Sequence, residues 1–208
     1  MSTSPAVRRY RPDDRAALYD ICVRTGHAGE DARGCYPDDD LLPIIFAAPY
    51  VEHEPELAFV VDDGTGRAVG YVLGTADTPR FAAWFRNVWL PRVGGRYPVP
   101  DGPSATPAEA MVKTLHTPER MVWPELADYP AHLHIDLLPE ARGRSLGRAL
   151  MARFLAELHA RGVPAVHLCM GNSNSGARAF YDRLGFRPLP VPDPGPVTYL
   201  GRSTGGDV

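Results

Sequence analysis

The sequence predicts an α/β fold, in which a mixed central sheet carries helices on both of its faces. Residues 131–138 and 164–170 are apolar enough to be buried strands. Between them, residues 144–161 place apolar side chains at helical spacing. A strand, a crossover helix and a second strand form a βαβ unit, whose two strands are parallel neighbours. The length of 208 residues suits one core, so we expect a single domain over 1–208.

The first half of the chain predicts shorter elements around a β-hairpin. Residues 57–62 and 68–75 are strand-like and flank the turn sequence Asp63-Gly64-Thr65-Gly66. The other elements expected before residue 131 are a strand at 6–11, a helix from Asp13 or Asp14 to Gly26, a helix at about 39–48, a helix beginning at Pro79 and a helical piece at 107–116.

The segment from about 79 to 130 is longer than a connection between packed elements usually is, so we expect an insertion with a role of its own. Its aromatic residues recur at helical spacing, which favours a core over a ligand-binding or interface role. Placed at one end of the sheet, the insertion would form walls of a substrate site. The aromatic and apolar residues concerned are Phe81, Trp84, Phe85, Val88 and Trp89.

Composition excludes several classes of protein. The formal net charge of −3, without long runs of like charge, argues against nucleic-acid binding. The three cysteines form no CxxC pair, so neither a disulfide framework nor a zinc site is indicated, and we expect no metal. No apolar stretch is long enough for a membrane span, and the first residues lack an apolar signal segment. We therefore expect a cytoplasmic protein without a membrane partner.

The polar stretch from residue 27 to residue 40 has two interpretations. It contains several acidic residues and Tyr36. It is either a solvated loop that ends in an acidic cap for the helix at about 39–48, or the rim of a pocket that attracts a cationic amine.

The candidate ligand site follows the strand at 131–138. The apolar run stops at Pro139, passes through a basic turn that contains Gly143 and Gly147, and enters the helix. Backbone N–H groups at such a junction are unpaired and lie at the positive end of the helix dipole, which suits a phosphate or pyrophosphate. An ordinary strand-to-helix connection is the alternative. A nucleotide phosphotransferase is disfavoured because no Gly-x-x-x-x-Gly-Lys-Ser/Thr element exists.

Two motifs resemble those of the GNAT acetyltransferases. Residues 142–147 (Arg-Gly-Arg-Ser-Leu-Gly) resemble the acyl-CoA pyrophosphate loop, whose pattern is Gln/Arg-x-x-Gly-x-Gly/Ala, with Ser145 in place of the middle glycine. Residues 174–186 (Asn-x-x-Ala-x-x-Phe-Tyr-x-x-Leu-Gly-Phe) resemble the second signature. Nearly the whole chain is similar to the acetyltransferase-like C-terminal domain of O-GlcNAcase, here without the glycoside hydrolase portion. The resemblance implies a GNAT fold with a splayed parallel strand pair.

The resemblance also implies an acetyl-CoA-dependent N-acetyltransferase that acts on an amine of a small molecule or a protein. Unpaired backbone groups of Leu137 and Leu138 would contact the pantetheine arm and the acetyl oxygen, and Asn174 would contact the cofactor arm. The turn would bind the pyrophosphate through its N–H groups and its guanidinium groups. The expected cofactor-contacting residues are Leu137, Leu138, Arg142, Gly143, Arg144, Ser145, Leu146, Gly147, Arg148, Asn174, Ala177 and Tyr181.

The expected catalytic residues lie on the second signature and on the strand before the turn. Tyr181 matches the family tyrosine near the cofactor sulfur, where its hydroxyl acts as general acid; otherwise it is a tyrosine on an apolar helix face. Strand alternation places His132, His134 and Asp136 on one face. We expect Asp136 as the base because it lies nearest the splay, with His134 second. The alternative is that these residues are hydrogen-bonded groups covering the sheet.

A function from another class remains open at this point. A non-catalytic acyl-CoA-binding or protein-interaction module with the GNAT fold would bind the same cofactor without consuming the thioester. A homodimer is a further expectation, since GNAT-like domains are often dimers.

Overall fold

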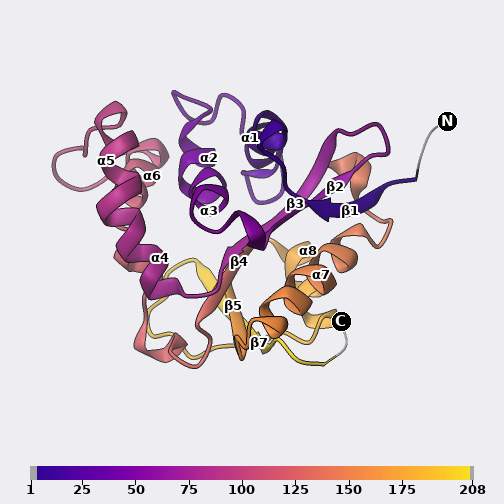
Figure 1. Cartoon of the computed structure of the whole chain (residues 1–208). Coiled ribbons are helices and arrows are strands. Elements are labelled where there is room, and N and C mark those ends of the chain that lie inside the picture. The colour runs from indigo at the N-terminus through magenta and orange to yellow at the C-terminus, as the bar shows by residue number, and fades with distance from the viewer. Residues whose placement is uncertain (1–3, 207–208) are drawn as a thin grey trace.

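A computed structural model describes residues 4–206 and contains one seven-stranded mixed sheet (Figure 1). Its strands lie in the order β1-β2-β3-β4-β5-β7-β6. Neighbouring strands are antiparallel, except for the parallel pair β4 and β5. The mixed sheet predicted from the sequence is therefore confirmed. The strands are β1 (Ala6–Arg9), β2 (Ala58–Asp62), β3 (Ala68–Thr75), β4 (Ala131–Leu137), β5 (Ala165–Gly171), β6 (Arg187–Pro188) and β7 (Val197–Ser203).

Helices cover both faces of this sheet, because successive side chains of a strand point to opposite faces. Tyr71 of β3 contacts Cys22 of α1 on one face. Gly74 of β3 lies against Phe154 of α7 on the other face, where a side chain on residue 74 would collide with the ring. The helices are α1 (Arg15–Thr25), α2 (Leu41–Phe46), α3 (Ala48–His53), α4 (Thr78–Trp84), α5 (Leu90–Val93), α6 (Pro107–His116), α7 (Leu146–Ala160) and α8 (Ser175–Arg183).

The helix predicted at about 39–48 is present as α2, and a second short helix, α3, follows it directly. Pro49 has no N–H group to donate to the carbonyl of Ile45, so the helical hydrogen-bond ladder is interrupted there. The backbone turns at Ala47, whose φ and ψ are −131° and −62°. The break lets α3 extend to His53 and turns Tyr50 into the core, where only 2 % of its surface is exposed.

The insertion between β3 and β4 forms a helical lobe beside α2, which Figure 1 shows as α4, α5 and α6 at one end of the molecule. Between α4 and α5 the segment η3 (Phe85–Trp89) has π-helical hydrogen bonding. Trp89 donates from its indole N–H to the carbonyl of Ile44 at 2.8 Å. Phe81, Phe85 and Trp89 are buried, as expected for core residues.

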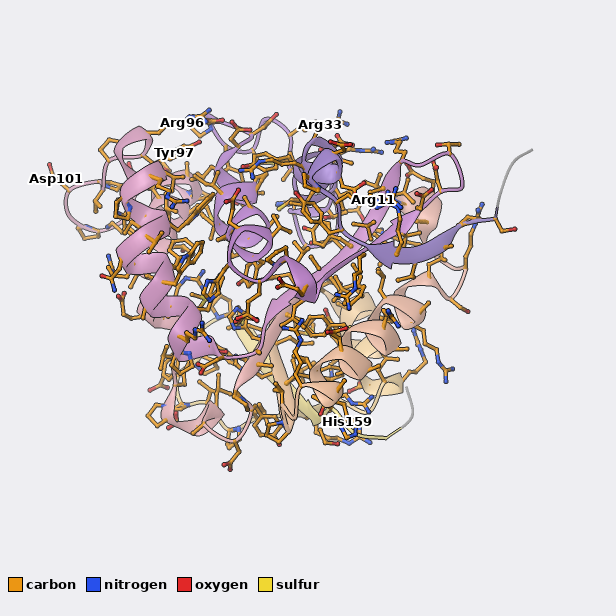
Figure 2. All side chains as sticks on the ribbon, viewed as in Figure 1. Arg11, Arg33, Arg96, Tyr97, Asp101 and His159 are labelled. Atoms are coloured by element: carbon orange, nitrogen blue, oxygen red, sulfur yellow. The ribbon has the colours of Figure 1, made fainter. Side chains whose placement is uncertain are left out.

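Hydrogen bonds and ion pairs connect the acidic stretch before α2 to this lobe. Asp38 accepts a hydrogen bond from the Tyr97 hydroxyl at 2.6 Å. It also forms an ion pair with Arg96 at 2.5 Å. Arg96 also contacts Asp40 at 2.9 Å, and Figure 2 labels Arg96 and Tyr97 on the lobe. Since these two carboxylates are paired within the protein, the loop interpretation fits the end of the stretch, next to α2.

The parallel strands β4 and β5 separate soon after they meet. They pair only at Ala131 with Val166 and at His132 with His167. Residues 133–137 of β4 have no partner on β5, although they remain paired with β3. The splayed pair is confirmed, and it leaves a gap inside the sheet. Among residues 4–206, no helix is both long enough and apolar enough to cross a membrane.

Candidate active site

A cavity of about 880 Å³ lies between the end of β4, the start of α7, helix α8 and the loop after α1. Its lining includes every expected cofactor-contacting residue except Leu138 and Arg144, and it also includes Asp136. Thr25 at the end of α1 also lines the cavity, as do Ala28, Gly29 and Glu30 of the loop that follows. The start of the polar stretch at 27–40 therefore borders the cavity, as the pocket-rim interpretation predicts. His134 lies outside this cavity.

The turn before α7 is shaped to bind an anion. Gly143 and Ser145 both have left-handed backbone conformations, with φ of +73° and +58°. Within the described residues, the backbone N–H groups from Gly143 to Gly147 form no hydrogen bond. These N–H groups lie at the start of the 15-residue helix α7 and border the cavity, so the turn fits a pyrophosphate group.

The arginines of the turn have different surroundings. Arg142 donates to the carbonyls of Leu137 at 3.1 Å and Gly29 at 2.6 Å, so its guanidinium joins β4 to the loop after α1. Arg148 lines the cavity, and Arg144 is exposed outside its wall. Arg142 thus holds the cavity wall together, and its predicted contact with the ligand stays a prediction.

Leu138 does not present the unpaired backbone groups expected of it. Its N–H donates to the carbonyl of Val69 at 3.0 Å, and its carbonyl accepts from the N–H of Ala141 at 2.9 Å. Antiparallel pairing alternates between the two sides of a strand, so the N–H groups that face the gap belong to Ile135 and Leu137. The prediction is wrong for Leu138 because the alternation directs the N–H group of this residue toward β3.

Asn174 is the N-cap of α8, and its side-chain oxygen accepts from the N–H of Ala177 at 3.0 Å. This hydrogen bond stabilises the first turn of α8, where Asn174 and Ala177 both line the cavity. The expected position of Asn174 beside the cofactor arm is thus compatible with the structure, since its amide N–H₂ group is not used by the cap.

Tyr181 and Asp136 both line the cavity, and their environments favour different protonation behaviour. Burial, with a smaller effect of Asp136, raises the pKa of Tyr181, so the phenol keeps its proton at neutral pH. The Asp136 carboxylate accepts a hydrogen bond from the Tyr71 hydroxyl at 2.7 Å. Burial raises the pKa of Asp136, although this hydrogen bond opposes the shift. A retained phenol proton suits a general acid.

His132 and His134 share the face of β4 with Asp136 but have other neighbours. The hydroxyl of Tyr50 lies 2.8 Å from Nε2 of His132 and 3.0 Å from Nε2 of His134. Nδ1 of His132 lies 2.8 Å from Oγ1 of Thr78. Sequence reasoning missed Tyr50 and Thr78, since no local pattern links α3 and α4 to β4. The expected histidine face is therefore a hydrogen-bonded cluster under α3.

The histidines are held neutral by their surroundings. Burial, followed by the positive charge of Arg120 and the neighbouring His167, lowers the pKa of His134 to about 4. Burial likewise lowers the pKa of His132 well below its usual range. Arg120 lies over the ring of Phe46 at 5.8 Å and forms no ion pair with any residue in 4–206. Within the same residues, no group of His, Cys, Asp and Glu is arranged to hold a metal ion.

The comparisons with known proteins agree with this geometry. A sequence profile of the acetyltransferase (GNAT) family matches residues 120–186, which include β4, the turn, α7, β5 and α8. The chain is 66% identical to SsHAT, a protein of known crystal structure, over 98% of this chain and 100% of that one, with a TM-score of 0.94.

More distant relatives extend the comparison. The chain is 28% identical over 204 residues to rat protein O-GlcNAcase, which covers 95% of this chain and 22% of the relative. It therefore spans about a fifth of the length of that protein. The phosphinothricin acetyltransferase of Sinorhizobium meliloti, a GNAT protein solved in complex with AcCoA, has a TM-score of 0.55 at 14% identity, over 99% of this chain and 91% of that one. This last likeness supports the fold.

Proposed function

This chain belongs to the GNAT acetyltransferase family, and we propose that it transfers the acetyl group of acetyl-CoA to an amine of a small molecule or a protein. One observation carries the proposal. The cavity begins at a turn of unpaired N–H groups, which suits a pyrophosphate, and ends at the gap beside Ile135 and Leu137. An elongated ligand with a pyrophosphate near one end and a reactive carbonyl at the other fits this arrangement.

The chemistry divides among the residues of the cavity. When bound, acetyl-CoA supplies an activated acetyl group. The turn from Gly143 to Gly147 would hold the pyrophosphate, and the N–H groups of Ile135 and Leu137 would polarise the acetyl carbonyl. The Tyr181 hydroxyl would protonate the leaving thiolate. A base on β4, for which Asp136 and His134 are the candidates, would take the proton of the attacking amine.

The substitution of Gly143 tests the turn directly. Asp and Asn both tolerate the left-handed conformation at this position, and no atom lies within 4 Å of a side chain placed there. We expect Gly143→Asp to weaken acetyl-CoA binding at least about 10-fold relative to Gly143→Asn, because only the aspartate repels the pyrophosphate. Isothermal titration calorimetry with acetyl-CoA and with CoA measures both variants.

Turnover is tested by release of free thiol from acetyl-CoA in the presence of panels of amines and peptides. Consumption of the thioester with a given acceptor supports the transferase. Binding of acetyl-CoA without thiol release across these panels would favour a non-catalytic acyl-CoA-binding or interaction module. Absence of any binding to the wild-type chain would remove both functions.

We also propose that the protein acts in the cytoplasm and forms a homodimer. Cys22, Cys35 and Cys169 are free thiols, which supports a reducing cytoplasm as the place of the reaction. A homodimer is proposed from the family likeness. Light scattering of the purified protein distinguishes a dimer from a monomer.

A further inference from the structure

Four side chains on the α3 side of the sheet form one continuous hydrogen-bonded chain. It runs from Thr78 of α4 to His132 of β4, then to Tyr50 of α3, and ends at His134 of β4. The separations of the bonded atoms are 2.8, 2.8 and 3.0 Å. Thr78, His132 and Tyr50 are all at most 5 % exposed, so water does not compete for these bonds. Each hydroxyl has one proton to donate, and this limits how the protons can be arranged.

The first bond of the chain sets its direction. Oγ1 of Thr78 lies 2.8 Å from the carbonyl oxygen of Pro130. A carbonyl oxygen can only accept, so the Thr78 proton must lie between these two oxygens. Oγ1 of Thr78 therefore accepts from His132, which carries its proton on Nδ1.

The donor and acceptor of each remaining hydrogen bond then follow. His132 is neutral, so its Nε2 has no proton and accepts from the Tyr50 hydroxyl. The single Tyr50 proton is thereby used, and the Tyr50 oxygen accepts from Nε2–H of His134. His134 is left with an unprotonated Nδ1. Within residues 4–206, this Nδ1 atom has no hydrogen-bond partner, and it is not among the fully buried polar atoms.

We propose that His134 is the base of the acetyl transfer, accepting the amine proton at Nδ1, and that Thr78, His132 and Tyr50 are positioning residues that fix its tautomer. This proposal rests on the proposed function. In the step, the amine nitrogen bonds to the acetyl carbon as the carbon–sulfur bond breaks. The amine proton passes to Nδ1 of His134, and the thiolate takes the proton of the Tyr181 hydroxyl.

The place of His134 in the sheet supports this role. It lies two residues beyond His132, where β4 and β5 last pair, so it borders the gap. It is also two residues from Asp136 on the same face of β4, about 7 Å along the strand from the wall of the cavity. Asp136 faces α1, where its Oδ2 accepts from the Tyr71 hydroxyl. Nδ1 of His134, in contrast, forms no hydrogen bond with any residue in 4–206 and is open to accept a proton.

Five groups face His134 and influence its protonation. They are Tyr50 from α3, Phe46 from α2, Arg120 from the 3₁₀ turn η5 (Pro118–Met121), and His132 and His167 from the sheet. Among these groups, Arg120 has the permanent positive charge, which favours the neutral imidazole before the amine arrives. Protonation at Nδ1 leaves Nε2–H bonded to Tyr50, so the chain persists in the protonated state.

Long-range proton–nitrogen correlation NMR of ¹⁵N-histidine-labelled protein tests the tautomers without any ligand. Two histidines serve as internal references, because each donates to a carbonyl: His116 from Nε2 to Tyr97 and His167 from Nδ1 to Tyr129, both at 2.7 Å. We expect His134 to show the Nε2–H pattern of His116 and His132 to show the Nδ1–H pattern of His167. The reverse patterns, or averaging between tautomers at His134, would overturn the proposal.

Variants at Thr78 separate positioning from packing. Thr78→Ser keeps the hydroxyl and is expected to keep both tautomers. Thr78→Val keeps the shape of the side chain but removes the hydroxyl, so His132 loses its anchor and His134 is expected to show mixed tautomers. A folded Thr78→Val protein with an unchanged His134 pattern would contradict the positioning role.

The catalytic role is measured with an acceptor found by thiol release. We expect His134→Gln to lower kcat about 100-fold or more, with an unchanged Kd for acetyl-CoA. The matched control is His159→Gln at the exposed end of α7, labelled in Figure 2, which is expected to keep full activity. Loss of turnover in Asp136→Asn with full turnover in His134→Gln would reassign the base to Asp136. Failure of acetyl-CoA binding by the wild-type chain would instead remove the proposed function, while the tautomers would still be measured.

Discussion

The two sides of strand β4 differ in how they are held. Toward β3, residues 132–137 are paired along their whole length, and α7 packs closely against this part of the sheet. Toward β5, pairing stops at His132, and the neighbouring surface contains a cavity and a polar cluster. Burial and close packing therefore stabilise the side of β4 that faces β3, which we call the closed side. On the side that faces β5, the open side, oriented hydrogen bonds position the groups proposed to bind the ligand and transfer protons.

The largest expected effect comes from breaking the closed side at Gly74. A Cβ atom there would overlap the carbonyl oxygen of His132 and lie 2.9 Å from Cε2 of Phe154. We expect Gly74→Ala to lower the free energy of unfolding by about 3 kcal/mol, at the upper end of overpacking effects. Chemical denaturation measures the change. Gly95→Ala is the control, because nothing lies within 4 Å of a Cβ at that position. Equal stability of the two variants would contradict the close packing.

The next effect concerns the open side, where Tyr181 is the proposed acid. Tyr181→Phe removes the hydroxyl and preserves the aromatic ring, whose centroid lies 5.6 Å from that of Phe186. We expect kcat to fall about 100-fold and the Kd for acetyl-CoA to remain within about 2-fold, because the proton donor acts only in the chemical step. Steady-state thiol release and calorimetry measure the two quantities. An unchanged kcat would show that Tyr181 only packs.

A third effect is the acid sensitivity of the polar cluster. The lowered pKa of His134, about 4, means that the unfolded chain binds a proton between pH 7 and pH 5 and the folded chain does not. The contribution of His134 to the free energy of unfolding is therefore present at pH 7. It decreases as the pH is lowered, by about 2 kcal/mol at pH 5. The raised pKa of Asp136 acts in the opposite direction.

Comparison of unfolding at pH 7 and pH 5 in the wild type and in His134→Gln isolates the histidine contribution. The variant is expected to lose about 2 kcal/mol less than the wild type over this range. The same pH dependence in both proteins would contradict a neutral, buried His134.

The smallest effect is at Ser145, where the turn contains a left-handed residue other than glycine. This conformation costs an L-residue with a side chain about 1 kcal/mol or more, part of which the greater flexibility of unfolded glycine offsets. We expect Ser145→Gly to raise the free energy of unfolding by up to about 1 kcal/mol and to retain acetyl-CoA binding. Thermal unfolding and calorimetry measure these quantities. Destabilisation would indicate that the serine side chain makes a contribution of its own.

Local patterns predicted most of the fold. The hairpin, the βαβ unit and the helix at 107–116 follow from periodicity and turn residues, which act over short distances along the chain. Helix α3 was not predicted, because it is only six residues long and has Pro49 in its first turn. The splay came from the family resemblance, since apolar periodicity does not show where two strands part.

The candidate site was predictable in its motifs and less so in its partners. The turn and Asn174 were found from residue order, and both line the cavity. The use of Arg142 to bind carbonyls was not predicted, because the Gly29 carbonyl it holds lies 113 residues away in sequence. Tyr50 and Thr78 were missed for the same reason. They are ordinary core residues until tertiary structure brings them to the histidines of β4.

The gap between β4 and β5 gives the sheet two edges in its interior. Beyond His132, each of these strands presents main-chain groups to the gap as an outer strand would. A ligand that fills the gap would cover those groups. Cofactor binding is thus expected to do for this protein what an additional strand does for others, and the ligand-free chain is the form most open to unwanted strand addition.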